Sequence, residues 1–372
     1  MKKNSRKILA ISVFMIGCLF GGFLSGKLMV KLDLISAGRN TGDKIVLLVA
    51  LLISLFASCL LAIIIHEGGH LVCGLLSGYK YLLFRVGSLT LIKRNNKFEF
   101  KKFAIKGTGG QCILMPPESD DPQKVPFLLY HAGGGLFNLL TAIISFLIAL
   151  AIENTILDIF LWVLGFISVI FAFTNLLPIK IQVPNDGYNI MMMLLKPSER
   201  TAIYNMLKIN GLLFNGLTPS QVPVKFNELG SEGFYKTAEN LIKGGALIDS
   251  LNFEAAEKLF DEGAKDDTIP YYQLESRSEL MFCKIMNKAP AEEIDALYDK
   301  ELAKFIANAG KTFISKRRQM YAYYLLYKHD PQSAEKEYQA AMKLKDTYPI
   351  EGEILSELKL LDVVKKHAAN NI

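Results

Sequence analysis

Apolar residues gather in four long runs in the first half of the chain. The runs cover Ile8–Val30, Ile45–Leu76, Phe127–Ile152 and Ile159–Leu177. Each is long enough to cross a bilayer core of roughly 30 Å as a helix, so the pattern predicts about four transmembrane helices. The first run follows several basic residues, as a signal peptide would. It lacks a clear small-residue cleavage site, however, so we expect a retained helix.

A stretch of different character separates the second and third runs. Leu82–Leu91 is rich in β-forming residues, Arg94–Lys97 has the composition of a turn, and Phe98–Phe103 alternates aromatic with charged residues. This pattern predicts a small β-hairpin at the membrane surface, whose edge could pair with an extended peptide. The alternative is a solvated connector. Glycines, prolines and paired aspartates in Gly107–Asp121 predict a flexible loop.

The composition changes after Pro197 to a charged, amphipathic pattern that predicts a cytoplasmic helical domain. Phe253–Phe260 and Ala334–Ala341 both have the alanine and aromatic spacing of the second helix in a helix-turn-helix repeat. A tetratricopeptide-like all-α domain of this kind would bind a cytoplasmic protein or peptide. The alternative is an irregular bundle that packs on the membrane domain. The predicted parts are an N-terminal helix and loop (1–44), a membrane core (45–198) and the helical domain (199–372).

Composition and charge support a membrane protein and indicate its topology. The 372 residues are 51% hydrophobic with a mean hydropathy of +0.26, which is too apolar for an ordinary soluble protein. Basic residues concentrate between the second and third runs, whereas the link from the third to the fourth offers only Glu153 and Asp158. The positive-inside rule then places both termini in the cytoplasm. Short spans and a basic start favour a bacterial plasma membrane, and no pattern suggests nucleic-acid binding.

The second run contains His66-Glu67-Gly68-Gly69-His70, a metal-binding HExxH motif. Two histidines four residues apart project from one helix face and can hold one zinc ion, with Glu67 beside it. Polar groups at membrane depth are costly unless they bind something or face a wet cavity. The five cysteines show no CxxC spacing, which predicts neither disulfides nor a cysteine zinc site. Cys73 returns near the face of His66, but packing is its preferred role.

Catalytic zinc usually has three protein ligands, so a third must lie elsewhere. Asp186 is preferred because prolines break the helix before it and return irregular backbone to the depth of the motif, where Gly187 would allow a tight turn. In the alternative, Asp186 and Gly187 form a turn that caps a helix over Tyr188–Leu195. His131 at the start of the third run is a further candidate. Less suitable acids lie at the opposite face or in the predicted loop: Glu153, Asp158, Glu118, Asp120 and Asp121.

Three motifs together resemble those of the site-2 proteases, which are intramembrane zinc metalloproteases. They are the HEGGH motif, the segment Gly133-Gly134-Gly135-Leu136-Phe137-Asn138, and Asn175-Leu176-Leu177-Pro178 followed by Asp186-Gly187. The resemblance covers about Ile45 to Leu195, and it implies a site-2-protease-like core. It also implies that His66, His70 and Asp186 hold zinc, that Glu67 is the general base, and that Asn138 and Asn175 position substrate or core helices.

The chain departs from the family pattern in two ways. The aspartate usually lies five residues after the proline and follows leucine, whereas Asp186 lies eight residues after Pro178 and follows Asn185. No segment has the pattern of the PDZ domain that many relatives carry. The helical domain is therefore expected to regulate the enzyme or select its substrates.

The expected function is cleavage within or near the transmembrane segment of single-span membrane proteins or signal-peptide remnants, in regulated proteolysis. Such a protein would contact the lipid bilayer and a membrane-embedded peptide substrate. The main alternative is a membrane-anchored adaptor whose helical domain binds a partner and whose metal site is structural or vestigial. A protease with a glutamate as third ligand is disfavoured, because no downstream glutamate lies at a suitable depth.

Overall fold

The computed structural model describes most of the chain after residue 40, and contacts divide it into two units. The predicted first membrane helix, Ile8–Val30, lies outside the described residues apart from Gly26 and Val30. The first unit comprises residues 1–77, 126–180 and 184–191, and the second comprises residues 78–125, 181–183 and 192–372. The described residues are 26, 30, 33, 37, 38, 40–94, 97–105, 107–152, 155–179, 184–223, 230–265 and 269–369.

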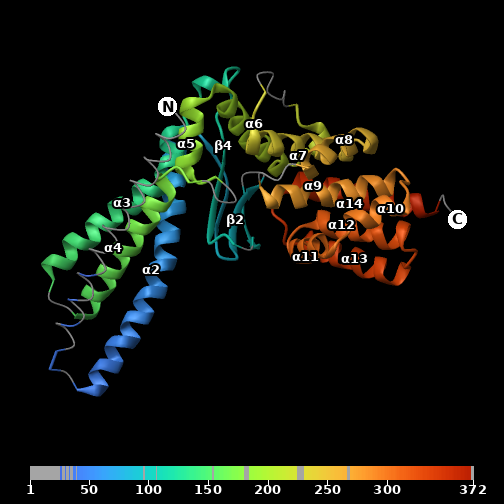
Figure 1. Cartoon of the computed structure of the whole chain (residues 1–372). Helices are drawn as coiled ribbons and strands as arrows, with labels where there is room; N and C mark the ends of the chain where they lie inside the picture. The colour runs from blue at the N-terminus through green and yellow to red at the C-terminus, as the bar shows by residue number, and fades with distance from the viewer. Residues whose placement is uncertain are drawn as a thin grey trace. The chain divides into compact units, whose positions relative to one another are not determined.

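Three helices of the first unit, α2, α3 and α4, are long and apolar enough to cross a membrane within the described residues. They run over Thr41–Leu76, Leu128–Ala151 and Thr155–Leu176, and the short helix α5 follows at Asp186–Leu195. Figure 1 shows the three long helices side by side, and each pair of them is in contact. At 1.5 Å per residue, the 36 residues of α2 extend about 54 Å. These helices agree with the second, third and fourth predicted spans.

Small residues allow α2 and α3 to approach closely. A Cβ atom added at Gly69 would lie 2.3 Å from the carbonyl oxygen of Gly133, and one at Gly133 would lie 2.8 Å from Cβ of Cys73. Side chains therefore cannot replace either glycine without separating the two helices. Close backbone contact through small residues is the usual way in which membrane helices associate. Cys73 is buried in this contact, which accords with a packing role.

The second unit begins with a four-stranded antiparallel sheet in the order β3-β2-β1-β4. The predicted hairpin is confirmed in its second half, where Arg94 pairs with Lys97. Two details of the prediction are wrong. Leu82–Leu91 is not one strand, because the chain turns at Gly87 with a φ of 59°. The predicted loop contains β4, in which Leu114 is buried and Met115 packs in the apolar cluster of the sheet. The strands are Lys80–Val86 (β1), Leu89–Arg94 (β2), Lys97–Lys102 (β3) and Gly110–Met115 (β4).

Most of the other described residues of the second unit are helical. Its core contains Phe260, Phe282, Leu302 and Ile314, all with 2% exposure or less.

Helices α8 and α13 lie where the two repeat-like segments were predicted, and each packs against the helix before it. The tetratricopeptide-like character of these pairs stays a prediction. The helices are Pro197–Phe214 (α6), Gly233–Asp249 (α7), Phe253–Lys265 (α8), Pro270–Met286 (α9), Ala291–Leu297 (α10), Lys300–Ala309 (α11), Ile314–Ala322 (α12), Pro331–Leu344 (α13) and Glu351–Ala369 (α14), with short 3-10 turns at Pro122–Lys124 (η1) and Pro219–Gln221 (η2) and a π-helical turn at Tyr323–Tyr327 (η3).

The sheet is attached to the helical part of the same unit. Arg94 makes an ion pair of 2.7 Å with Glu351, and Lys101 donates a hydrogen bond of 2.9 Å to the carbonyl oxygen of Asp346. Ile92 and Phe214 share one apolar cluster. Sheet and helices therefore form one compact body, whereas the sequence grouped the strands with the membrane core. The predicted domain boundaries stay predictions.

Candidate metal centre

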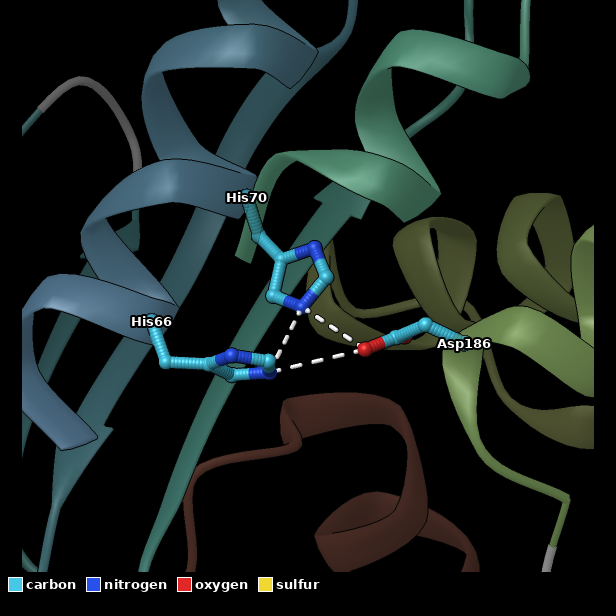
Figure 2. Close-up of side chains that lie close together, drawn as sticks. All are labelled: His66, His70 and Asp186. Atoms are coloured by element: carbon cyan, nitrogen blue, oxygen red, sulfur yellow. Dashed lines mark hydrogen bonds and ion pairs between the residues drawn. The ribbon is translucent and has the colours of Figure 1, made fainter. Parts of the chain in front are cut away.

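Three of the predicted site residues lie together in the first unit, as Figure 2 shows. His66 and His70 are one turn apart on α2, and Asp186 is the first residue of α5. The two Nε2 atoms are 3.1 Å apart. Oδ2 of Asp186 lies 3.4 Å from Nε2 of His66 and 3.2 Å from Nε2 of His70. The structure therefore contains a compact group that could hold a metal ion.

Hydrogen bonds fix the orientation of both imidazole rings. Nδ1 of His66 lies 2.9 Å from Oδ1 of Asn138, and Nδ1 of His70 lies 2.8 Å from the carbonyl oxygen of Tyr130. Both partners are acceptors, so each Nδ1 must carry the hydrogen and donate it. Asn138 is itself fixed, because its Nδ2 donates to the carbonyl oxygen of Ala62 at 3.0 Å. Each neutral ring then presents the lone pair of Nε2 toward Asp186, which is the arrangement of metal-binding histidines.

The spacing of the three atoms fits a tetrahedral metal ion. Two Nε2 lone pairs and a carboxylate oxygen face one another at 3.1–3.4 Å, and such groups repel unless a cation lies among them. A tetrahedral centre with bonds of about 2.0–2.1 Å separates its ligand atoms by about 3.3–3.4 Å. The observed triangle matches that size, and a fourth position would remain for another ligand.

Asn185 positions the carboxylate of Asp186. Its Oδ1 accepts hydrogen bonds from the backbone N–H groups of Tyr188 (2.9 Å) and Ile179 (3.1 Å). Its Nδ2 donates to the carbonyl oxygens of Thr174 and Leu177, at 2.6 Å each. Asn185 therefore caps α5 and ties it to the end of α4. The alternative in which Asp186 supplies the cap is wrong, because the side chain of the preceding residue takes that role.

Close packing positions the residue that follows Asp186. The neighbouring Gly187 was expected to allow a tight turn. Its role is instead close approach, because a Cβ atom there would lie 2.1 Å from the carbonyl oxygen of Leu176.

Gly134 leaves room above the histidine rings. A Cβ atom at this position would lie 2.5 Å from Nε2 of His70 and 2.6 Å from Cε1 of His66. The glycine-rich stretch of α3 therefore serves two purposes. Gly133 permits helix contact, and Gly134 keeps space beside the nitrogen atoms that face Asp186.

The remaining predicted residues occupy other places. Glu67 follows His66 on α2 and is 9% exposed. The side chain of Asn175 donates to the carbonyl oxygen of Phe171 in its own helix, and its role with substrate stays a prediction. His131 is buried, and its Nε2 has no hydrogen-bond partner among the described residues.

The other ligand candidates are not in this group of possible metal ligands. Among the described residues, that group contains only His66, His70 and Asp186. Glu118 pairs with Lys208 at 3.0 Å, Asp121 caps the short turn at Pro122, and Glu153 lies outside the described residues. Cys73, Asp120, His131 and Asp158 are likewise absent from the group.

Two groups at the centre were missed by sequence reasoning. The carbonyl oxygen of Tyr130 has no side-chain signature, so no pattern could identify it. Asn185 does have a signal, because asparagine just before an Asp-Gly pair and an apolar helix is a typical N-cap. No protein-family model, curated protein or solved structure matches this chain. The likeness to site-2 proteases therefore rests on the motifs alone.

Proposed function

We propose that this protein is an intramembrane zinc metalloprotease of the site-2 protease type. The observation that carries the proposal is the convergence of the electron pairs of His66, His70 and Asp186 in a unit whose described part includes three long apolar helices. Two nitrogen ligands and one carboxylate oxygen form a set typical of catalytic zinc. Glu67 lies next to a ligand in sequence, as the general base of an HExxH enzyme does.

The chemistry would be hydrolysis of a peptide bond. When bound, zinc supplies a Lewis acid that polarises a carbonyl group and makes water more acidic. Glu67 takes a proton from the attacking water as the C–O bond forms. It then delivers that proton to the leaving nitrogen as the C–N bond breaks. Asn138 and the carbonyl group of Tyr130 hold the histidine rings in place throughout.

The depth of the motif indicates the substrate. The motif lies in the last three turns of α2, within a helix apolar enough to span a membrane. A peptide bond that reaches this depth belongs to another membrane segment, so we expect single-span proteins or signal-peptide remnants as substrates. A helical segment hides its carbonyl groups in internal hydrogen bonds, and substrates with helix-breaking residues should be cleaved faster.

Replacement of Glu67 by glutamine tests this proposal most directly. The variant keeps the ligands but loses the base, so we expect cleavage of a co-expressed single-span substrate to fall by about 100- to 10,000-fold with bound zinc unchanged. Mass spectrometry should detect membrane peptides that accumulate in the variant. Asp43→Asn is a matched carboxylate-to-amide control on α2, and it should cleave normally because Asp43 is exposed near the start of that helix.

Two results would contradict the protease. Normal cleavage by Glu67→Gln would remove Glu67 from the mechanism. The cellular function of the protein can also be compared between two variants. If Glu67→Gln keeps that function and only deletion of the residues after Pro197 abolishes it, the adaptor alternative is favoured. Zinc content alone does not distinguish the two functions, because either permits a bound metal.

A further inference from the structure

A cavity of about 340 Å³ lies inside the helical part of the second unit. Helices α6, α7, α9, α12 and α14 supply most of its wall. Asp249, at the end of α7, connects elements on one side of the wall. It accepts hydrogen bonds from Ser220 and Ser356 and forms an ion pair of 2.8 Å with Lys359. Hydrogen bonds and an ion pair therefore connect the elements that form this side of the cavity wall.

Two adjacent glycines in α7 have different surroundings at the cavity wall. A Cβ atom at Gly244 would lie 2.3 Å from the ring of Phe260, so this glycine is required for packing. A Cβ atom at Gly245 would meet nothing within 4 Å, and Gly245 lines the cavity. Glycine inside a helix costs roughly 0.5–1 kcal/mol relative to alanine. Gly245 therefore borders open space, and a large side chain at this position could enter the cavity.

One wall is apolar and another carries four carboxyl groups. Three of the four acids have basic partners. Arg318 contacts Glu279 at 2.9 Å and Glu357 at 2.7 Å, and Lys316 contacts Glu275 at 2.6 Å. Three of the acids thus share two cations.

The fourth acid, Glu353, is the exception. It accepts a hydrogen bond from the hydroxyl group of Tyr348, but no basic side chain pairs with it among the residues that the structure describes. Burial raises the pKa of Glu353 to about 7, and the nearby Glu357 and Glu275 add to the rise against the effect of Tyr348. A cation beside Glu353 would stabilise the ionised form of its carboxyl group.

We propose that this cavity binds a cationic group on an aliphatic stem, such as the side chain of lysine or arginine. The ammonium or guanidinium group would lie at Glu353, and the stem would lie along the apolar wall formed by residues such as Ile242 and Leu360. The volume is at the lower end for ligand sites, so it suits one side chain or a small amine. This site is separate from the metal centre and does not depend on the proposed protease activity.

Calorimetric titration of the full-length protein in detergent micelles tests the inference. The probes are Nα-acetyl-lysine amide, Nα-acetyl-arginine amide and the uncharged Nα-acetyl-norleucine amide. We expect a basic probe to bind about tenfold or more tightly than norleucine, as a charge-assisted hydrogen bond predicts. Cadaverine and agmatine distinguish the source, because tighter binding of these free amines indicates a small metabolite and weaker binding indicates a peptide.

Two variants, Glu353→Gln and Gly245→Leu, test whether the probes bind in this cavity. Glu353→Gln should weaken the basic probes by about tenfold or more without affecting norleucine. Gly245→Leu should fill the cavity and abolish binding, and it favours helix formation, so it remains informative if the first variant folds poorly. Glu292→Gln changes an exposed glutamate of α10 and should bind as the unmodified protein does.

Three outcomes would overturn the proposal. They are equal binding of norleucine and the basic probes, unchanged binding by Glu353→Gln or Gly245→Leu, and no binding of any basic probe. Failure of the protease proposal would be visible separately, because Glu67→Gln should bind the probes normally whether or not the enzyme cleaves membrane proteins.

Discussion

Two clusters of charged and polar side chains lie in apolar surroundings, and they are built in opposite ways. In the membrane unit, two Nε2 atoms and Oδ2 of Asp186 face one another at 3.1–3.4 Å, and all three offer electron pairs. In the helical domain, the guanidinium group of Arg318 lies between Glu279 and Glu357 at 2.9 Å and 2.7 Å. The first cluster collects acceptors, whereas the second pairs donors with acceptors.

The difference separates a site from a structural network. Buried charges that are not compensated cost several kcal/mol, so a cluster of acceptors is stable only with a cation supplied from outside. The Arg318 cluster already contains a cation between its two carboxylates, and the guanidinium group also lies 4.0 Å from the ring centre of Phe282. Burial of charge therefore does not identify function by itself. Acceptor groups that lack a positive partner are a better guide to a binding site, and they occur at the two histidines with Asp186 and at Glu353.

The sharpest test of this comparison is removal of one acceptor from the first cluster. His70→Ala takes away one of the three converging electron pairs. Loss of an outer partner costs about 10- to 100-fold in metal affinity, so loss of a ligand should exceed 100-fold. Metal analysis of the purified protein and titration with zinc would measure the change. His367→Ala removes a histidine of α14 and should leave bound zinc unchanged. Equal zinc content in both variants would exclude a metal centre at His70.

Mutation of the Arg318 cluster should lower the stability of the protein and leave its metal content unchanged. Arg318→Met leaves Glu279 and Glu357 buried without a cation, so we expect the free energy of unfolding to fall by about 3–5 kcal/mol. Denaturant unfolding of the full-length protein in detergent would measure this loss. Lys265→Met breaks an exposed pair with Asp261 and should change stability little. If Arg318→Met is as stable as the Lys265 variant, the buried pairs are not needed to hold the domain together.

A smaller loss of zinc affinity is expected when only the orientation of the His66 ring is disturbed. Asn138→Leu keeps the size of the side chain but removes the acceptor for Nδ1 of His66. Outer partners of metal-bound histidines contribute about 10- to 100-fold to affinity, and zinc binding should weaken by that amount. Thr141→Val, one turn further along α3, removes a hydroxyl group that bonds only within its helix and is the matched control. Unchanged affinity in Asn138→Leu would show that the ring is fixed by packing alone.

Sequence spacing predicted the part of the site that lies on one helix. His66 and His70 meet because a helix repeats every 3.6 residues, and this relation needs no knowledge of the fold. Asp186 was chosen from breaks in the apolar pattern, and the structure brings it to the histidines despite the longer spacing after Pro178. Backbone contacts carry no such signal. The acceptor at Tyr130 and the clearance at Gly134 follow from how α3 packs on α2, which sequence alone does not specify.

For the fold as well, some elements could be predicted from local sequence and others could not. Long apolar runs predicted α2, α3 and α4 because a membrane-length stretch has few alternatives. Strand β4 was mistaken for a loop, since two glycines and two prolines flank it and outweighed the short apolar run Ile113–Met115. The pairing of β4 with β1 supplies the missing information, and such non-local pairing overrides local preference.

The smallest effect should come from the residue that holds Asp186 in place. Asn185→Ala removes the cap of α5 and the links to Thr174 and Leu177, and loss of an N-cap costs typically about 1 kcal/mol. Asn40→Ala removes the corresponding cap of α2, where the side chain accepts from Asp43 at 2.9 Å. Both variants should therefore lose stability in unfolding experiments, and Asn185→Ala should lose more because it also breaks the links to Thr174 and Leu177. Only Asn185→Ala should also weaken zinc binding, because its cap fixes the carboxylate that completes the cluster of acceptors. Equal zinc affinity in the two variants would mean that the metal itself, rather than Asn185, draws Asp186 toward the histidines.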